Sequence, residues 1–356
     1  MQSFQAFIAL GVWITVGGQF TIAALPRPVM HTIVPTGIAR APEVCASAAE
    51  IIAGLTAPAA YIAPKFLYDP LGSRLFEAIC ELPEYYPTRT EAEIVKRFAS
   101  EIALACGSAN TVIDLGAGNC TKAISLFSLL RPAQYVAVAI ASEFVHAALA
   151  QLQPRFPWID MHAVGQDFSA GLALPPQVRQ EKRLFFYPGS SIGNFTPDEA
   201  RAFLQRLRAQ CDKRGGLLLG VDLVKDRATL EAAYDDALGV TAAFNRNVLR
   251  HANRIAATGF DLADWRHRAF FDSARSRVEL HLEATRDVSV RWPGGERRFA
   301  QGQTIHTENS HKYSRRTLTR LLAQGGWHAV SIWTDPRDWY ALVYAQPARM
   351  HAGPHA

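Results

Sequence analysis

Two glycines and an acid, Asp114, Gly116 and Gly118, form a D-x-G-x-G loop directly after a short apolar run. Glycine lets the backbone approach a ligand closely, and such loops between a strand and a helix often hold nucleotides. Thr121 stands where the G-x-G-x-x-G dinucleotide fingerprint has its third glycine. The loop therefore favours a ligand without a pyrophosphate, such as S-adenosylmethionine, and an ordinary tight turn is the alternative.

A second candidate for cofactor binding is the pair Asp167-Phe168, at the end of the third expected strand. The carboxylate could accept a hydrogen bond from an adenine amino group, and the aromatic ring could stack beside the base. A loop acid next to a core phenylalanine would give the same sequence, so this assignment stays open.

Histidine spacing does not predict a metal site. His306-x-Glu308 matches the first half of a zinc deaminase signature, but no P-C-x-x-C follows it. His306, Glu308 and His311 also lack the H-E-x-x-H spacing of a zinc protease. The five cysteines are far apart and form no C-x-x-C, which argues against a zinc ribbon and against a disulfide framework. We therefore expect no metal ion and a reducing, cytoplasmic environment.

The elements that would position these loops alternate between strand and helix from about residue 110 to 224, which predicts a doubly wound parallel sheet. Residues 226–315 break the alternation with a long helical stretch over 226–256 and antiparallel strands around a Pro-Gly-Gly turn at 293–295. A helix and two strands then close the chain. The fold class expected is α/β, a Rossmann-like class I S-adenosylmethionine-dependent methyltransferase fold with an inserted α+β substrate-binding domain.

The domain boundaries follow from this pattern. The substrate-binding domain is expected from residues 37–89 and 225–315, and the S-adenosylmethionine-binding domain from residues 90–224 and 316–348. Residues 349–356 are expected to be a disordered tail, and residues 1–29 an apolar extension.

The N-terminal extension has no charged residue from Phe4 to Leu25, a length that suits a membrane-spanning helix. The Gly17–Gly18 pair weakens such a helix, and no basic segment precedes it as in a signal peptide. We expect translation to begin at Met30, with a membrane anchor and a cleaved signal as the alternatives.

Composition excludes a disordered chain, since 49% of the 356 residues are hydrophobic and 19% are charged. The net charge of +5 is spread over a large surface, so we expect no nucleic-acid partner. A monomer that acts on a small molecule is the expectation.

Four stretches give a more specific indication. They are residues 64–93 (PKFLYDPLGSRLFEAICELPEYYPTRTEAE), 189–197 (GSSIGNFTP), 222–249 (DLVKDRATLEAAYDDALGVTAAFNRNVL) and 307–314 (TENSHKYS). Together they strongly resemble the ergothioneine-pathway L-histidine N-α-methyltransferases, over about residues 45–346. The resemblance implies three successive methyl transfers from S-adenosylmethionine to the α-amino nitrogen of L-histidine, which give hercynine.

The resemblance also implies roles for individual residues. Tyr68 and Asn194 would be the catalytic residues at the substrate amine. The residues implied to bind the rest of histidine are Gly189 and Asn194 near the amine and carboxylate, Tyr234 at the carboxylate, and Tyr85, Leu280, Glu308 and Ser310 around the imidazole. The residues implied to bind the cofactor are Asp114, Gly116, Gly118, Lys122, Asp167 and Phe168. Without the resemblance, most of the substrate-site positions are better explained by packing or by turns.

Two departures from the family pattern stand out. Ala139 occupies the end of the second strand, where relatives usually carry an acid that binds the ribose hydroxyls, and Glu143 lies one helical turn later. Leu280 stands where relatives often have methionine, a volume-conserving change. Ala139 keeps open a methyltransferase-like binding protein without turnover, and an N-methyltransferase of another aromatic amino acid, such as tryptophan, is the enzymatic alternative.

Overall fold

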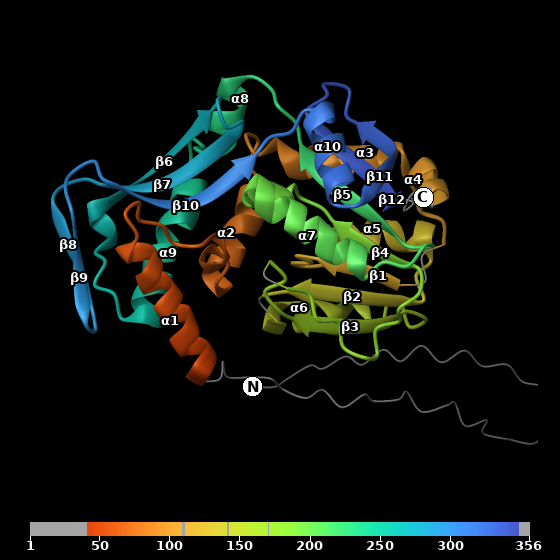
Figure 1. Cartoon of the computed structure of the whole chain (residues 1–356), viewed down its shortest axis with the longest axis horizontal. Helices are drawn as coiled ribbons and strands as arrows, with labels where there is room; N and C mark the ends of the chain where they lie inside the picture. The colour runs from red at the N-terminus through yellow and green to blue at the C-terminus, as the bar shows by residue number, and fades with distance from the viewer. Residues whose placement is uncertain (1–40, 109–110, 141, 170, 349–356) are drawn as a thin grey trace, which may run out of the picture. The chain divides into compact units, whose positions relative to one another are not determined.

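The computed structural model describes residues 41–108, 111–140, 142–169 and 171–348 (Figure 1). The apolar extension at residues 1–29 and the tail at 349–356, both expected from the sequence, lie outside the described residues. Within the described ranges, no helix combines the length and the apolar character that crossing a membrane requires.

A seven-stranded sheet has the order β11-β12-β5-β4-β1-β2-β3. Its strands are β1 (Thr111–Leu115), β2 (Gln134–Ala139), β3 (Asp160–Gly165), β4 (Arg183–Tyr187), β5 (Gly216–Asp222), β11 (Trp327–Thr334) and β12 (Tyr340–Pro347). The first five in sequence are parallel, and β12 pairs antiparallel with both β5 and β11. This is the strand order of class I methyltransferases, so the expected fold class is confirmed.

Helices cover both faces of this sheet, because its central strands are apolar on both sides. One face packs against α7 (Pro197–Ala209) and α10 (Arg315–Gln324). The other face packs against α3 (Tyr86–Arg97), α4 (Ala99–Cys106), α5 (Thr121–Leu130) and α6 (Ser142–Leu152). Each βα loop therefore ends at one edge of the sheet, where ligands of open α/β sheets bind.

A separate core forms around a three-stranded antiparallel sheet of order β10-β7-β6. Its strands are β6 (Trp265–Asp272), β7 (Arg277–Ala284) and β10 (Thr304–His311), and the hairpin β8 (Val288–Trp292) and β9 (Gly295–Phe299) extends from it (Figure 1). The helices α8 (Arg227–Ala232) and α9 (Val240–Ala256) pack on this sheet, and α1 (Ala41–Thr56), η1 (Pro64–Leu67) and α2 (Pro70–Cys80) pack in turn on α9. The segments match the expected inserted domain, while its boundaries stay a prediction.

The prediction of a single helical stretch over residues 226–256 is wrong about its continuity, because α8 ends at Ala232 and α9 begins at Val240. Gly239 precedes α9 with a φ of 75°, and the carboxylate of Asp236 accepts hydrogen bonds from the backbone N–H groups of Val240 and Thr241. This local cap competes with a continuous helix. The break places Tyr234 in an irregular segment between the two helices.

Candidate active site

One cavity gathers all eight residues that the sequence assigns to histidine. It lies where the loop after β4 meets the three-stranded sheet, α2 and α9. The predicted residues that line it are Tyr68, Tyr85, Gly189, Asn194, Tyr234, Leu280, Glu308 and Ser310. Their roles stay predictions, but segments that are far apart in sequence do converge on one site.

Aromatic rings form one wall of this cavity. The ring of Tyr68 meets those of Phe76 and Phe244 edge to face, with centroids 5.6 Å apart in both pairs. Tyr85 contacts Phe76 and Tyr234 in the same way, at 6.1 Å. Burial raises the pKa of Tyr68 and of Tyr85 well above the ordinary value of a phenol, so both hydroxyls stay protonated and can donate a hydrogen bond.

A bulge in β10 turns Glu308 toward the cavity. The pairing of β10 with β7 shifts between His306 and Glu308, so that one extra residue, Thr307, enters β10. Ile305 and Glu308 consequently share the face of Leu280, whereas strict alternation would place Ile305 and Glu308 on opposite faces. The bulge therefore moves a carboxylate onto the apolar face of the sheet.

The carboxylate of Glu308 is buried and has one hydrogen-bond donor from the neighbouring loop. Asn194, at the end of the short helix η2 (Ser191–Asn194), donates from Nδ2 to Oε1 of Glu308 over 2.9 Å. A Cβ at Gly193 would lie 2.8 Å from the carbonyl oxygen of His311, so glycine permits this close approach of loop and strand. Burial raises the pKa of Glu308 to about 7, although Lys312 and Asn194 act to lower it.

Three polar groups form a closed triangle beside Glu308. The ammonium of Lys312 donates to the hydroxyl oxygens of Tyr234 and Ser310 over 2.8 Å each, and these two hydroxyls lie 2.7 Å apart. Lys312 also pairs with Asp222 at 2.7 Å, which uses its third hydrogen. Since one hydroxyl donates to the other, the pair keeps one hydroxyl hydrogen for a ligand.

Asp222 is the centre of a buried network that the sequence did not predict. Its carboxylate pairs with Lys225 at 2.6 Å and accepts a 2.6 Å hydrogen bond from the Tyr86 hydroxyl, in addition to Lys312. Burial would raise the pKa of Asp222, but Lys312 and Lys225 together hold it below the ordinary value. Lys312 stands in the TENSHKYS string two residues after Ser310, and strand alternation could have placed both on one face.

A second buried acid, Glu91, also escaped the sequence assignments. It accepts hydrogen bonds from the backbone N–H of Gly189 at 2.9 Å and from the Tyr340 hydroxyl at 2.7 Å. Lys122, predicted to bind the cofactor, pairs with the same carboxylate at 2.7 Å. Glu91 thus joins the substrate cavity to the helix that follows the glycine loop.

The glycine loop that follows β1 has a backbone conformation that its two glycines permit. Gly116 and Gly118 have φ values of 77° and 52°, a region that disfavours other residues. A Cβ at Gly116 would lie 3.8 Å from the ring of Phe168, so the loop and the predicted aromatic residue are neighbours.

The two predicted acids of the cofactor site have different surroundings. Asp114 is buried and accepts a 2.7 Å hydrogen bond from the Tyr135 hydroxyl, and burial raises its pKa to about 7. Asp167 is half-exposed and pairs with Lys65 at 3.2 Å. The roles of both acids in binding the cofactor stay predictions.

Comparison with known proteins decides the family. The family profile described as histidine-specific methyltransferase, SAM-dependent, matches residues 47–347. The chain belongs to this family. It is 40% identical over 302 residues to a histidine N-alpha-methyltransferase of Mycolicibacterium smegmatis, and 37% identical over 302 residues to one of Mycobacterium tuberculosis. Both alignments cover 83% of this chain and 93% of the relative.

A longer fungal relative matches over a similar range. Ergothioneine biosynthesis protein 1 of Neurospora crassa is 34% identical over 294 residues, which is 80% of this chain and 33% of that protein. The chain is thus an S-adenosylmethionine-dependent methyltransferase, as the sequence predicted.

The described residues fit S-adenosylmethionine. The positive-φ glycines leave room for a ligand at the end of β1, and Phe168 with Asp167 stands beside them. When bound, the cofactor supplies a methyl group on a positively charged sulfur. Ala139 ends β2 with no carboxylate for the ribose, and Glu143 lies exposed in α6.

This methyltransferase should bind its cofactor more tightly when Ala139 is replaced by aspartate. A carboxylate at the end of β2 can accept hydrogen bonds from both ribose hydroxyls, and such charge-assisted bonds are worth roughly 1.5–3 kcal/mol. We expect Ala139→Asp to lower the Kd of S-adenosylmethionine about ten- to a hundred-fold in calorimetric titration. Glu143→Ala is the control and should change the Kd little. A large loss of affinity in Glu143→Ala, without a gain in Ala139→Asp, would instead assign the ribose to Glu143.

The buried carboxylate of Glu308 should make stability fall as pH rises. The folded protein binds the proton with a pKa of about 7, above the value of about 4.5 in the unfolded chain, so it holds more protons between these values. Glu308→Gln removes the titration and keeps an oxygen for Asn194. We expect its free energy of unfolding, relative to the parent, to increase by up to about 3 kcal/mol from pH 4.5 to pH 8.

Urea denaturation at several pH values measures this difference. Glu143→Gln, at an exposed acid, serves as the matched control and should follow the parent. Equal pH dependence in the parent and in Glu308→Gln would show that folding does not raise the pKa of Glu308.

Proposed function

We propose that this methyltransferase transfers three methyl groups in succession from S-adenosylmethionine to the α-amino nitrogen of L-histidine, which gives hercynine, the first step of ergothioneine biosynthesis. The observation that carries the proposal is the pair Glu308 and Ser310, two residues apart on one face of β10 and both lining the cavity. The names of the mycobacterial relatives support it.

Glu308 and Ser310 suit the two nitrogens of a neutral imidazole. The carboxylate of Glu308 accepts a hydrogen bond from the ring N–H, because Asn194 occupies only its Oε1. The Ser310 hydroxyl donates to the unprotonated ring nitrogen. An indole has one N–H and no acceptor, so tryptophan would leave Ser310 without its partner. Sites built on such polar contacts reject analogues that lack the matching group.

The triangle around Lys312 sets a limit on these contacts. If Ser310 donates its hydrogen to the imidazole, Tyr234 donates to Ser310 and has no hydrogen left for the substrate carboxylate. The two roles implied for Tyr234 and Ser310 therefore compete for one hydrogen while the triangle persists. We assign this hydrogen to Ser310, and Tyr234 then contacts the carboxylate end of the substrate by packing alone.

At the amine, the protein orients a nucleophile. The reacting form is the free amine, and it must align with the methyl group for transfer. Nδ2 of Asn194 donates to Glu308, so Oδ1 is left to accept a hydrogen bond from the amine. Tyr68 stays protonated and holds the other side of the same nitrogen. Burial of the cavity and the nearby sulfonium both disfavour the ammonium form.

A panel of amino acids tests the proposed substrate. The purified full-length protein is mixed with S-adenosylmethionine and each of the twenty amino acids, and products are weighed by mass spectrometry. We expect histidine to gain about 42 mass units, from three methyl transfers of about 14 each. Methylation of tryptophan in place of histidine would support the alternative substrate. Methylation of no amino acid would favour a binding protein without turnover.

Tyr68→Phe tests the proposed catalytic role of the hydroxyl. The change keeps the ring that packs on Phe76 and Phe244 and removes only the group next to the amine. We expect kcat to fall at least ten-fold and the histidine KM to change less, because positioning matters most in the transition state. Tyr61→Phe, at an exposed tyrosine, is the control. A parental kcat in Tyr68→Phe would reduce Tyr68 to a packing residue.

A further inference from the structure

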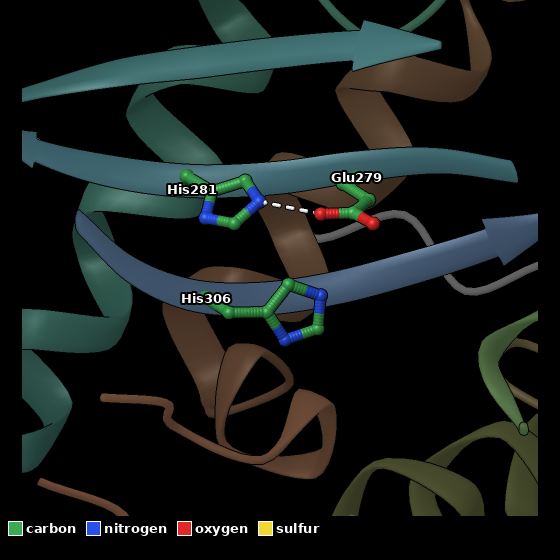
Figure 2. Close-up of side chains that lie close together, drawn as sticks. All are labelled: Glu279, His281 and His306. Carbon is green, nitrogen blue, oxygen red and sulfur yellow. Dashed lines mark hydrogen bonds and ion pairs between the residues drawn. The ribbon is translucent and has the colours of Figure 1, made fainter. Parts of the chain in front are cut away.

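The face of the three-stranded sheet that points away from the cavity carries a cluster of metal-ligand side chains. One ligand atom each from Glu279, His281 and His306 lies within 4.8 Å of the others (Figure 2). We propose that these three side chains, with the amide oxygen of Asn309, bind one divalent transition-metal ion such as Zn²⁺. A set of two imidazole nitrogens and two oxygens suits this class of ion.

The register of two strands builds the cluster. His281 of β7 pairs with His306 of β10, and Glu279 pairs with Asn309, so all four side chains share one face. Leu280 and Glu308, which line the histidine cavity, form a pair on the opposite face. The same bulge that turns Glu308 inward therefore brings His306 and Asn309 together outside.

The hydrogen bonds now present join ligand atoms to one another. Nε2 of His281 lies 2.9 Å from Oε2 of Glu279, and Nε2 of His306 lies 3.0 Å from Oδ1 of Asn309. Two ligands that each lie about 2.0–2.1 Å from a tetrahedral ion are separated by about 3.3 Å, so both pairs already have nearly the required spacing. When an ion binds, the hydrogen that each Nε2 now donates would move to Nδ1 of the same ring, which leaves both Nε2 atoms free for the ion.

Neighbouring side chains hold these ligands in place. Arg277 binds only Oε1 of Glu279, with contacts of 2.6 and 2.9 Å, and leaves Oε2 for an ion. The ring of Phe270 stacks on His281 at 5.4 Å and 14°. Arg268, opposite His281, pairs with Glu283 at 3.3 Å.

The sequence predicted no metal ion because spacing was considered along β10 alone. Glu308 and His311 have no part in this cluster, and Glu279 and His281 come from the neighbouring strand. An ion here would tie β7 to β10 directly behind the residues assigned to the imidazole. Because it would bind the folded chain and not the unfolded one, it would also raise the melting temperature.

Co²⁺ is the probe, because its absorption bands report the ligands that surround it. The full-length protein is stripped with a chelator and titrated with Co²⁺ in the absence of S-adenosylmethionine and histidine. We expect visible absorption bands that saturate at one ion per chain, that Zn²⁺ abolishes, and that accompany a rise in melting temperature. Absence of bands with the parent at millimolar Co²⁺ would overturn the proposal.

Variants locate the ion. His281→Ala and His306→Ala should each weaken Co²⁺ binding at least ten-fold, while His328→Ala, at an exposed position on β11, should leave it unchanged. His306→Gln keeps a polar side chain and replaces His306→Ala if that variant does not fold, as judged by circular dichroism and by S-adenosylmethionine binding. Parental Co²⁺ affinity in both histidine variants would place the ion elsewhere and refute the site. This test does not depend on the proposed reaction.

Discussion

The ion pair between Asp222 and Lys312 is the constraint on which the site depends, because both side chains are fully buried. Charges removed from water are costly unless each is paired and hydrogen-bonded, so loss of either partner would leave an uncompensated buried charge. Asp222 ends β5 of the large sheet and Lys312 follows β10 of the small one. Backbone hydrogen bonds of Tyr313 with Asp222 and Val224, both 3.0 Å, join the two sheets at the same point. The triangle around Lys312 follows from this junction.

The loop between β4 and α7 is held at its start by hydrogen bonds of two neighbouring residues, Gly189 and Ser190. Glu91 accepts a hydrogen bond from the backbone N–H of Gly189, and the hydroxyl oxygen of Ser190 accepts one from the backbone N–H of Asp222 at 2.8 Å. The buried carboxylate of Glu91 and the backbone of Asp222 therefore fix the start of the loop that carries Asn194. Glu91 also binds Lys122, which connects the position of this loop to the helix after the glycine turn.

Sequence patterns were sufficient for the order of the large sheet, since its strands are apolar runs separated by helices. Seven of the eight cavity residues, all but Leu280, lie in long shared strings, and a single sequence without that resemblance would not have linked Tyr68 to Glu308. Glu91 and Asp222 were missed because most of their partners lie about 30 to 250 residues away along the chain, and such contacts leave no local spacing; Lys225, three residues after Asp222, is the exception. The break between α8 and α9 was missed because Asp236 caps α9 through a local turn.

Because of the bulge at Thr307, the two faces of β10 carry side chains with unrelated roles. Which face a side chain of β10 lies on depends on the number of residues in the strand, not on the type of side chain. Loss of one residue here would restore simple alternation and exchange the faces on one side of the deletion: either Glu308 and Ser310 would leave the cavity, or Ile305 would leave the core. Every remaining residue of the segment could be unchanged, and the binding site would still be lost. For comparison of related chains, the length of this segment is therefore as informative as its composition, and an alignment gap at residues 306–308 would signal a different binding surface.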